Sequence, residues 1–83
     1  MALGIHRALV KVAAAVKDGR ASCSAVAADA ISELLATGFD MVEYLTVVDA
    51  ETLTPLERVR GAARVIVAAR LGRTRLIDNL AVD

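Results

Sequence analysis

The sequence predicts an α+β fold of two layers, in which an N-terminal helical hairpin packs on a three-stranded antiparallel β-sheet. Three observations lead to this prediction. Large apolar residues recur at helical spacing up to Gly38, β-branched residues dominate after it, and the dipeptide Gly72-Arg73 separates two strand-like runs. With 83 residues the chain has room for one domain, expected to span residues 1–83.

The segment from Leu3 to Lys17 is predicted to form an amphipathic helix. Its large apolar residues are Ile5, Leu9, Val12 and Val16. Their spacings of four, three and four place them on one face of the helix. Asp18-Gly19 is expected to end it, because glycine takes the left-handed conformation that closes a helix at low steric cost.

A second helix is expected to begin near Ser22 and Ser24, whose hydroxyl groups can accept hydrogen bonds from free backbone N–H groups. Its apolar stripe is made of Val26, Ala30, Ile31, Leu34 and Leu35. Gly38 is the expected stop. Alanines on both helices would let the two backbones approach closely.

The predicted sheet follows Gly38. The run "MVEYLTVVD", Met41 to Asp49, is rich in β-branched residues and too short for a typical helix. The segment "AETLTPLERVRG" contains the only proline, Pro55, and is expected to be a loop. The most apolar run, "ARVIVAARL", supplies the middle strand, Arg64 to Leu71. Thr74 to Val82 forms the third strand.

A hairpin with Gly72 at the first central position of its turn fixes the pairing of the last two strands. The expected cross-strand pairs are Leu71 with Thr74, Arg70 with Arg75, Ala69 with Leu76, and Val67 with Asp78. The residues expected to be buried are Leu9, Val12, Val16, Ile31, Leu34, Leu35, Leu45, Val47, Val65, Val67, Leu76 and Leu80.

The hairpin places Arg70 opposite Arg75, and two facing guanidinium groups repel each other unless an anion lies between them. One interpretation is an exposed pair relieved by water and by Glu43, Asp78 or Glu57. The other is a contact of Arg70, Arg73 and Arg75 with a phosphate, a carboxylate or another domain. Asp78-Asn79 is expected to pair with the opposing strand or to bind a backbone group.

The composition disfavours several functions. Ten basic and ten acidic residues give no net charge, and there are almost no aromatic residues, so a nucleic-acid partner is not expected. No apolar run is long enough to cross a membrane, and a cytoplasmic chain is the expectation. The single Cys23 and the single His6 cannot build a zinc site from nitrogen and sulfur ligands alone.

The sequence contains no recognisable catalytic, cofactor-binding or metal-binding constellation. His6 is expected to be a solvated helix residue. Cys23 is expected to be an incidental thiol, although a helix start could lower its pKa. The carboxylates Asp49, Glu51 and Glu57 do not have the spacing of a calcium-binding loop.

The stretch "YLTVVDAETLTPLERVRGAARVIVAARLGRTRLIDNLAV", from Tyr44 onward, closely resembles the C-terminal end of the pantothenate synthetases, also called pantoate–beta-alanine ligases. The motif "TRLIDN" after "AARLG" carries the resemblance. It implies a cytoplasmic enzyme that uses ATP and magnesium to make pantoyl adenylate, which the amine of beta-alanine attacks to give pantothenate and AMP. In that family the chemistry belongs mainly to a Rossmann-like N-terminal domain with a two-histidine motif.

That catalytic domain is absent from these residues, since one histidine cannot supply a two-histidine motif. The resemblance therefore implies an isolated C-terminal lid domain, inactive alone, whose partner is the N-terminal adenylation domain of the same enzyme. An independent module that self-associates, as a homodimer, is the alternative. No catalytic role is assigned to Arg70, Arg73 or Arg75, which are candidates for anion binding or for contact between domains.

Overall fold

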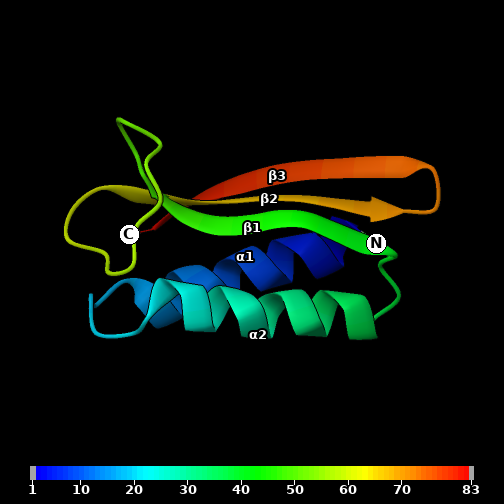
Figure 1. Ribbon diagram of the computed structural model, residues 1–83, viewed down its shortest axis with the longest axis horizontal. Helices are drawn as coiled ribbons and strands as arrows, with labels where there is room; N and C mark the ends of the chain where they lie inside the picture. Colours follow the sequence, from blue (N-terminus) through cyan, green and yellow to red (C-terminus); the bar gives the residue numbers. More distant parts are fainter. Residues whose placement is uncertain (1, 83) are drawn as a thin grey trace.

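The helices and strands follow one another along the chain in the predicted order. The computed structural model describes residues 2–82, and the side chains of Ala2 and Leu3 are outside the description. The elements are α1 (Ala2–Val16), α2 (Cys23–Ala36), β1 (Met41–Asp49), β2 (Ala63–Leu71) and β3 (Thr74–Val82). Both helices lie on one side of an antiparallel sheet in the order β1-β2-β3 (Figure 1). The predicted α+β, two-layer fold is confirmed.

Gly19 closes α1, as the sequence predicts. It takes a φ of 78°, which is the left-handed region, and its N–H donates to the carbonyl of Val16 at 3.0 Å. A Cβ at this position would stand 2.7 Å from the carbonyl oxygen of Val59. The turn therefore requires glycine for its conformation and for the close approach of the loop before β2.

Helix α2 begins at a serine cap. The hydroxyl of Ser22 accepts a hydrogen bond from the N–H of Ala25 at 3.2 Å, as expected for a helix N-cap. Ser24 does not share this role, because its hydroxyl donates to the carboxylate of Glu57. At the other end Gly38 takes a φ of 116°, and Phe39 folds back with its N–H on the carbonyl of Leu34.

The β2–β3 hairpin has the predicted register. Each expected pair is present: Leu71 with Thr74, Arg70 with Arg75, Ala69 with Leu76, and Val67 with Asp78. Gly72 has a φ of 60°, which the first central residue of this turn requires. The segment between β1 and β2 is a loop, as expected, and Pro55 in it forms an isolated bridge with Val48.

The core lies between the helices and the facing side of the sheet. Eight predicted core residues are buried: Leu9, Val12, Val16, Leu34, Leu45, Val47, Val65 and Val67. Ile31, Leu76 and Leu80 are only partly buried and pack against this core. Small residues such as Ala27 and Ala69 and the aromatic Phe39 are buried without being predicted, and Ala30 of the predicted stripe is buried as well.

The prediction for Leu35 is wrong, because 45% of its surface is exposed. The buried residues of α2 are Cys23, Ala27, Ala30 and Leu34. They follow a spacing of four, three and four, and Leu35 is about 100° around the helix from Leu34. The predicted stripe is too wide, because the face of α2 that packs in the core includes the small residues Cys23 and Ala27 and excludes the large Leu35.

Candidate functional site: the arginine hairpin

One carboxylate bridges the two facing arginines of the hairpin. The Nε of Arg70 donates to Oε2 of Glu43 at 2.6 Å, and the Nε of Arg75 donates to Oε1 of the same group at 2.8 Å. Of the three carboxylates considered from the sequence, Glu43 is therefore the one that relieves the repulsion. Both arginines are nearly half exposed, and Glu43 is 22% exposed, so the cluster lies at the surface.

A bulge in β1 brings Glu43 to this position. Val42 pairs with Ala69 and Tyr44 pairs with Ala68, so that two consecutive residues of β2 face three residues of β1. The extra residue is Glu43. Without the bulge, strand alternation would turn the glutamate and the tyrosine to opposite faces of the sheet, whereas here both lie on the face away from the helices.

The arginines keep part of their binding capacity. Hydrogen bonds from Arg70 first, and from Arg75 second, hold the pKa of Glu43 below its ordinary value, so this carboxyl is ionised at neutral pH. Within residues 2–82 each guanidinium is bonded to Glu43 through Nε, and its Nη atoms have no hydrogen-bond partner. The cluster therefore carries one excess positive charge and several free donors, which suit a carboxylate or a phosphate.

Asp40 holds the tip of the hairpin by two hydrogen bonds, and Arg73 at this tip is not part of the cluster of Arg70 and Arg75. The N–H of Gly72 donates to Oδ2 of Asp40 at 2.5 Å, and the N–H of Asp40 donates to the carbonyl of Arg70 at 2.9 Å. Arg73, exposed at the tip, makes no hydrogen bond or ion pair with the described residues. The structure thus joins Arg70 and Arg75 in one cluster, with Arg73 beyond it.

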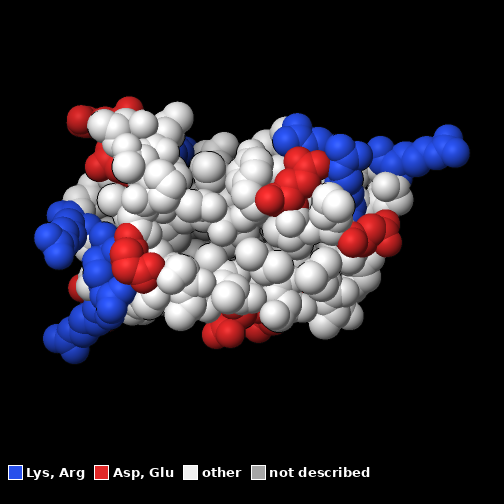
Figure 2. Space-filling model, viewed as in Figure 1, with Lys and Arg blue, Asp and Glu red and all other residues white. Residues whose placement is uncertain are grey.

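Most charged side chains gather at the two ends of the molecule in the view of Figure 2, with an uncharged surface between them that has acidic side chains only at its lower edge. One end holds the β2–β3 turn of Figure 1 and the arginine cluster. Asp78 is not part of that cluster, because it pairs with the buried Val67 on the helix side of the sheet and accepts a hydrogen bond from the N–H of Asn79. Asn79 accepts a hydrogen bond from Arg64 at 3.1 Å, so both have the structural roles expected.

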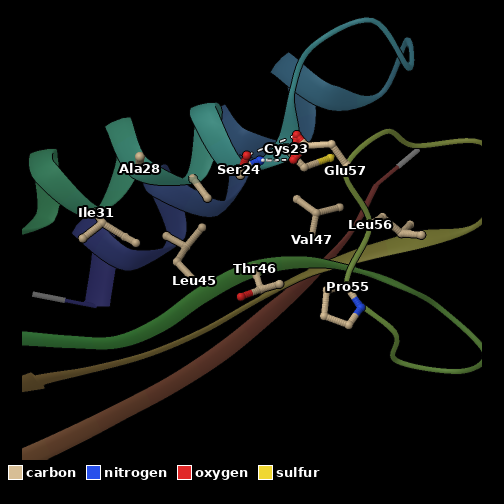
Figure 3. A pocket seen from close by; sticks show the side chains of 11 residues that line it. Cys23, Ser24, Ala28, Ile31, Leu45, Thr46, Val47, Pro55, Leu56 and Glu57 are labelled. Carbon is tan, nitrogen blue, oxygen red and sulfur yellow. Dashed lines mark hydrogen bonds between the residues drawn. The ribbon is translucent and has the colours of Figure 1, made fainter.

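The uncharged surface contains a groove of about 440 Å³ between α2 and β1, closed at one end by the loop after β1 (Figure 3). Its walls are mostly apolar and include Ile31, Leu45 and Leu56. Glu57 lies at the closed end, where Ser22 donates to it at 2.5 Å and Ser24 at 3.1 Å. These bonds, in that order, lower its pKa and fasten the loop to the start of α2.

Cys23 lies in this groove as a buried thiol. Burial is the main reason that its pKa is raised above the ordinary value, and the nearby charge of Glu57 raises it further. The suggestion that the helix start lowers this pKa is therefore wrong, since Glu57 already occupies the helix N-terminus. A protonated, buried thiol is a poor nucleophile, in agreement with an incidental role.

The described residues supply few reactive groups. His6 is exposed on α1, as expected. Among residues 2–82, no three His, Cys, Asp or Glu side chains are arranged to hold a metal ion. In the same part of the chain, no helix has the length and apolarity needed to span a membrane. The donors of the arginine cluster are suited to binding an anionic group, and they lie on a small two-layer α+β domain.

Comparison with known proteins places this domain in an enzyme family. The family model described as "Pantoate-beta-alanine ligase" matches residues 1–81, and the chain belongs to this family. It is 53% identical to the pantothenate synthetase of Rhizorhabdus wittichii over 79 residues, which cover 95% of the chain and 28% of that enzyme. With the pantothenate synthetase of Acidiphilium cryptum the identity is 46%, over 94% of the chain and 27% of the enzyme.

The fold agrees with that of a solved relative. The crystal structure of pantothenate synthetase from Thermus thermophilus superposes with a TM-score of 0.79 at 34% identity, covering 95% of this chain and 28% of that one. The chain thus spans little more than a quarter of the length of the relatives that it matches.

Proposed function

We propose that this chain is the C-terminal lid and docking domain of an ATP-dependent pantoate–beta-alanine ligase of the cytoplasm, and that it is inactive by itself. The observation that carries the proposal is the family match over residues 1–81 in a chain that covers about 28% of its relatives. Most of the polypeptide on which such an enzyme depends is therefore outside this sequence. Its partner is the N-terminal adenylation domain of the same enzyme.

The role proposed for the lid is to exclude water from a reactive intermediate. The intermediate implied by the family resemblance is an acyl adenylate, which water hydrolyses unless the site is closed before the amine of beta-alanine arrives. A rigid two-layer module can cover such a site and be withdrawn for product release. The family resemblance implies that the chemistry of ATP and magnesium belongs mainly to the N-terminal domain, and we assign no step that involves them to residues of this chain.

A second candidate function is an independent module that forms homodimers. The observation that favours it is the side chain of Ile77, which is 60% exposed on the side of the sheet that the helices leave uncovered. Apolar residues at an uncovered face are typical of interaction surfaces.

Two measurements on the purified chain separate these functions. We expect no ATP–pyrophosphate exchange in the presence of pantoate, with the full-length Rhizorhabdus wittichii enzyme as the positive control. Exchange by the 83 residues alone would show that they form the adenylate without the N-terminal domain, and would overturn the proposal. Light scattering tests the module: a monomer supports the lid, and a stable dimer supports self-association.

A further inference from the structure

The helices cover one face of the sheet and leave the other uncovered. This uncovered face, here called the outer sheet surface, includes Tyr44, Thr46, Val48, Ile66, Ala68 and Ile77, with Met41, Arg70 and Arg75 at one end and Arg64 with Asn79 at the other. Tyr44 is 37% exposed and Ile77 is 60% exposed. Between them lies Ala68, which pairs with both and is fully buried by its neighbours.

The edges of the sheet are poor sites for adding a further strand. On the β1 side, the bulge at Glu43 interrupts the ladder, and the loop binds the edge through Leu56 N–H to the carbonyl of Val47 at 2.9 Å and through the bridge of Pro55. On the β3 side, the charged Asp78 points to the helix side of an edge strand. Bulges, covering loops and inward charges all oppose edge-to-edge pairing. Association is therefore expected through the face.

The charge of the outer sheet surface selects the kind of partner. Its charged side chains are Arg64, Arg70 and Arg75 and one carboxylate, Glu43. A second copy would bring a second surface of the same positive charge, which is unfavourable for pairing face to face. An apolar surface with carboxylates at its border would satisfy both the exposed Tyr44 and Ile77 and the free Nη donors.

We propose that the outer sheet surface is where this domain docks on the larger part of the pantoate–beta-alanine ligase, which meets Tyr44 and Ile77 with apolar side chains and Arg70 and Arg75 with carboxylates. The inference rests on the proposed function, and it adds which surface makes the contact. Relatives of this chain carry more than twice its length in additional polypeptide, so a partner of sufficient size exists within the enzyme itself.

The first experiment uses a chimera in which this chain replaces the matching 79 residues of the Rhizorhabdus wittichii enzyme. Pantothenate formation by the chimera tests the proposed function, and an inactive but folded chimera overturns it. Ile77→Glu in the active chimera should lower kcat/KM by about tenfold or more, because it places a charge in an apolar contact. The matched control is Leu35→Glu on α2, equally a large exposed residue, which should leave kcat/KM within about twofold.

Equal activity of the Ile77→Glu and Leu35→Glu chimeras would overturn the docking surface while leaving the proposed function standing. A second measurement needs no substitution. Tyr44 is the only tyrosine of this chain, so hydroxyl-radical labelling of its peptide can be followed by mass spectrometry. We expect at least threefold less labelling of Tyr44 in the chimera than in the free chain. Equal labelling in both would overturn the proposal even if Ile77→Glu fails to fold.

Discussion

The two faces of the sheet are built from the same three strands and have opposite characters. On the helix side Val65 and Val67 are fully buried, whereas on the outer side Ile77 is 60% exposed, although each of these residues is large and apolar. What separates them is the alternation of side chains along a strand, together with a helical layer that covers only one face. The comparison teaches that a large apolar residue stabilises the fold on the face that the helices cover, whereas a residue of the same type, Ile77, stays exposed on the other face.

A second contrast, between two carboxylates, points the same way. Glu57 binds two serine hydroxyls and a backbone N–H of α2, so its hydrogen bonds serve the fold. Glu43 binds two guanidinium groups and leaves their Nη atoms free. The hydrogen bonds of Glu57 join parts of this chain to one another. The guanidinium groups bound to Glu43 keep donors that another molecule can bind.

The largest difference between the faces should follow from placing an aspartate on each. Val67→Asp buries an unpaired charge in the middle strand and should cost several kcal/mol, which is about the whole stability of so small a domain. Ile77→Asp, on the outer face, should cost about 1 kcal/mol or less. Urea denaturation followed by circular dichroism measures both, and similar losses would contradict the division into two faces.

Adjacent leucines on α2 allow a smaller test of the same division. Leu34 is 3% exposed and Leu35 is 45% exposed. Leu34→Ala should lower the free energy of unfolding by about 2 to 5 kcal/mol, because it leaves a cavity under the sheet. Leu35→Ala should lower it by roughly 0.5 kcal/mol or less. A greater loss from the second variant in denaturant titrations would mean that the helix is rotated.

The carboxylates of Glu43 and Glu57 should make the stability of the domain depend on pH. Because the pKa of each is lowered in the folded state, the ionised forms stabilise the fold above their ordinary value of 4.5, and this contribution is lost as the pH falls below it. Glu43→Gln and Glu57→Gln should each flatten the decline of the unfolding midpoint below that pH. An unchanged profile for a variant would show that its carboxylate is not held as described.

At neutral pH, the same two variants should loosen different parts of the molecule. Glu57→Gln should raise hydrogen exchange at the start of α2, near Ser24, because the loop is less firmly attached there. Glu43→Gln should affect exchange in the β2–β3 hairpin instead, where Arg70 and Arg75 then repel each other without a carboxylate between them. Mass spectrometry of the peptides measures this exchange. If both variants changed exchange in the same peptides, Glu43 and Glu57 would not hold different parts of the molecule.

The smallest effect is expected at the hairpin tip. Arg73 makes no hydrogen bond or ion pair within residues 2–82, so Arg73→Ala should leave the thermal midpoint of the free chain unchanged within error. Arg75→Ala, which removes a bond to Glu43, serves as the comparison and should lower the midpoint measurably. A large loss for Arg73→Ala alone would place this residue in the fold rather than at a free surface.

Local patterns predicted most of the architecture. Both helices, all three strands and the register of the β2–β3 hairpin are those expected, because periodicity and turn residues such as Gly19 and Gly72 act over a few positions of the chain. The predicted register also places Arg70 opposite Arg75, as the structure has them. The family resemblance to pantothenate synthetases, noticed from Tyr44 onward, is confirmed over residues 1–81.

The sequence by itself determined the elements and their order, with bounds that are one residue off at each end of α1 and at the start of β2, and which residues of the last hairpin face each other. Only the tertiary structure decided that a bulge brings Glu43, rather than Asp78 or Glu57, to the two arginines, and that Leu35 turns away from the core. The reason is the range of the interactions. Periods and turns depend on neighbours in the chain, whereas the contacts of Glu43 and Glu57 join residues some thirty positions apart, which only the packed layers bring together.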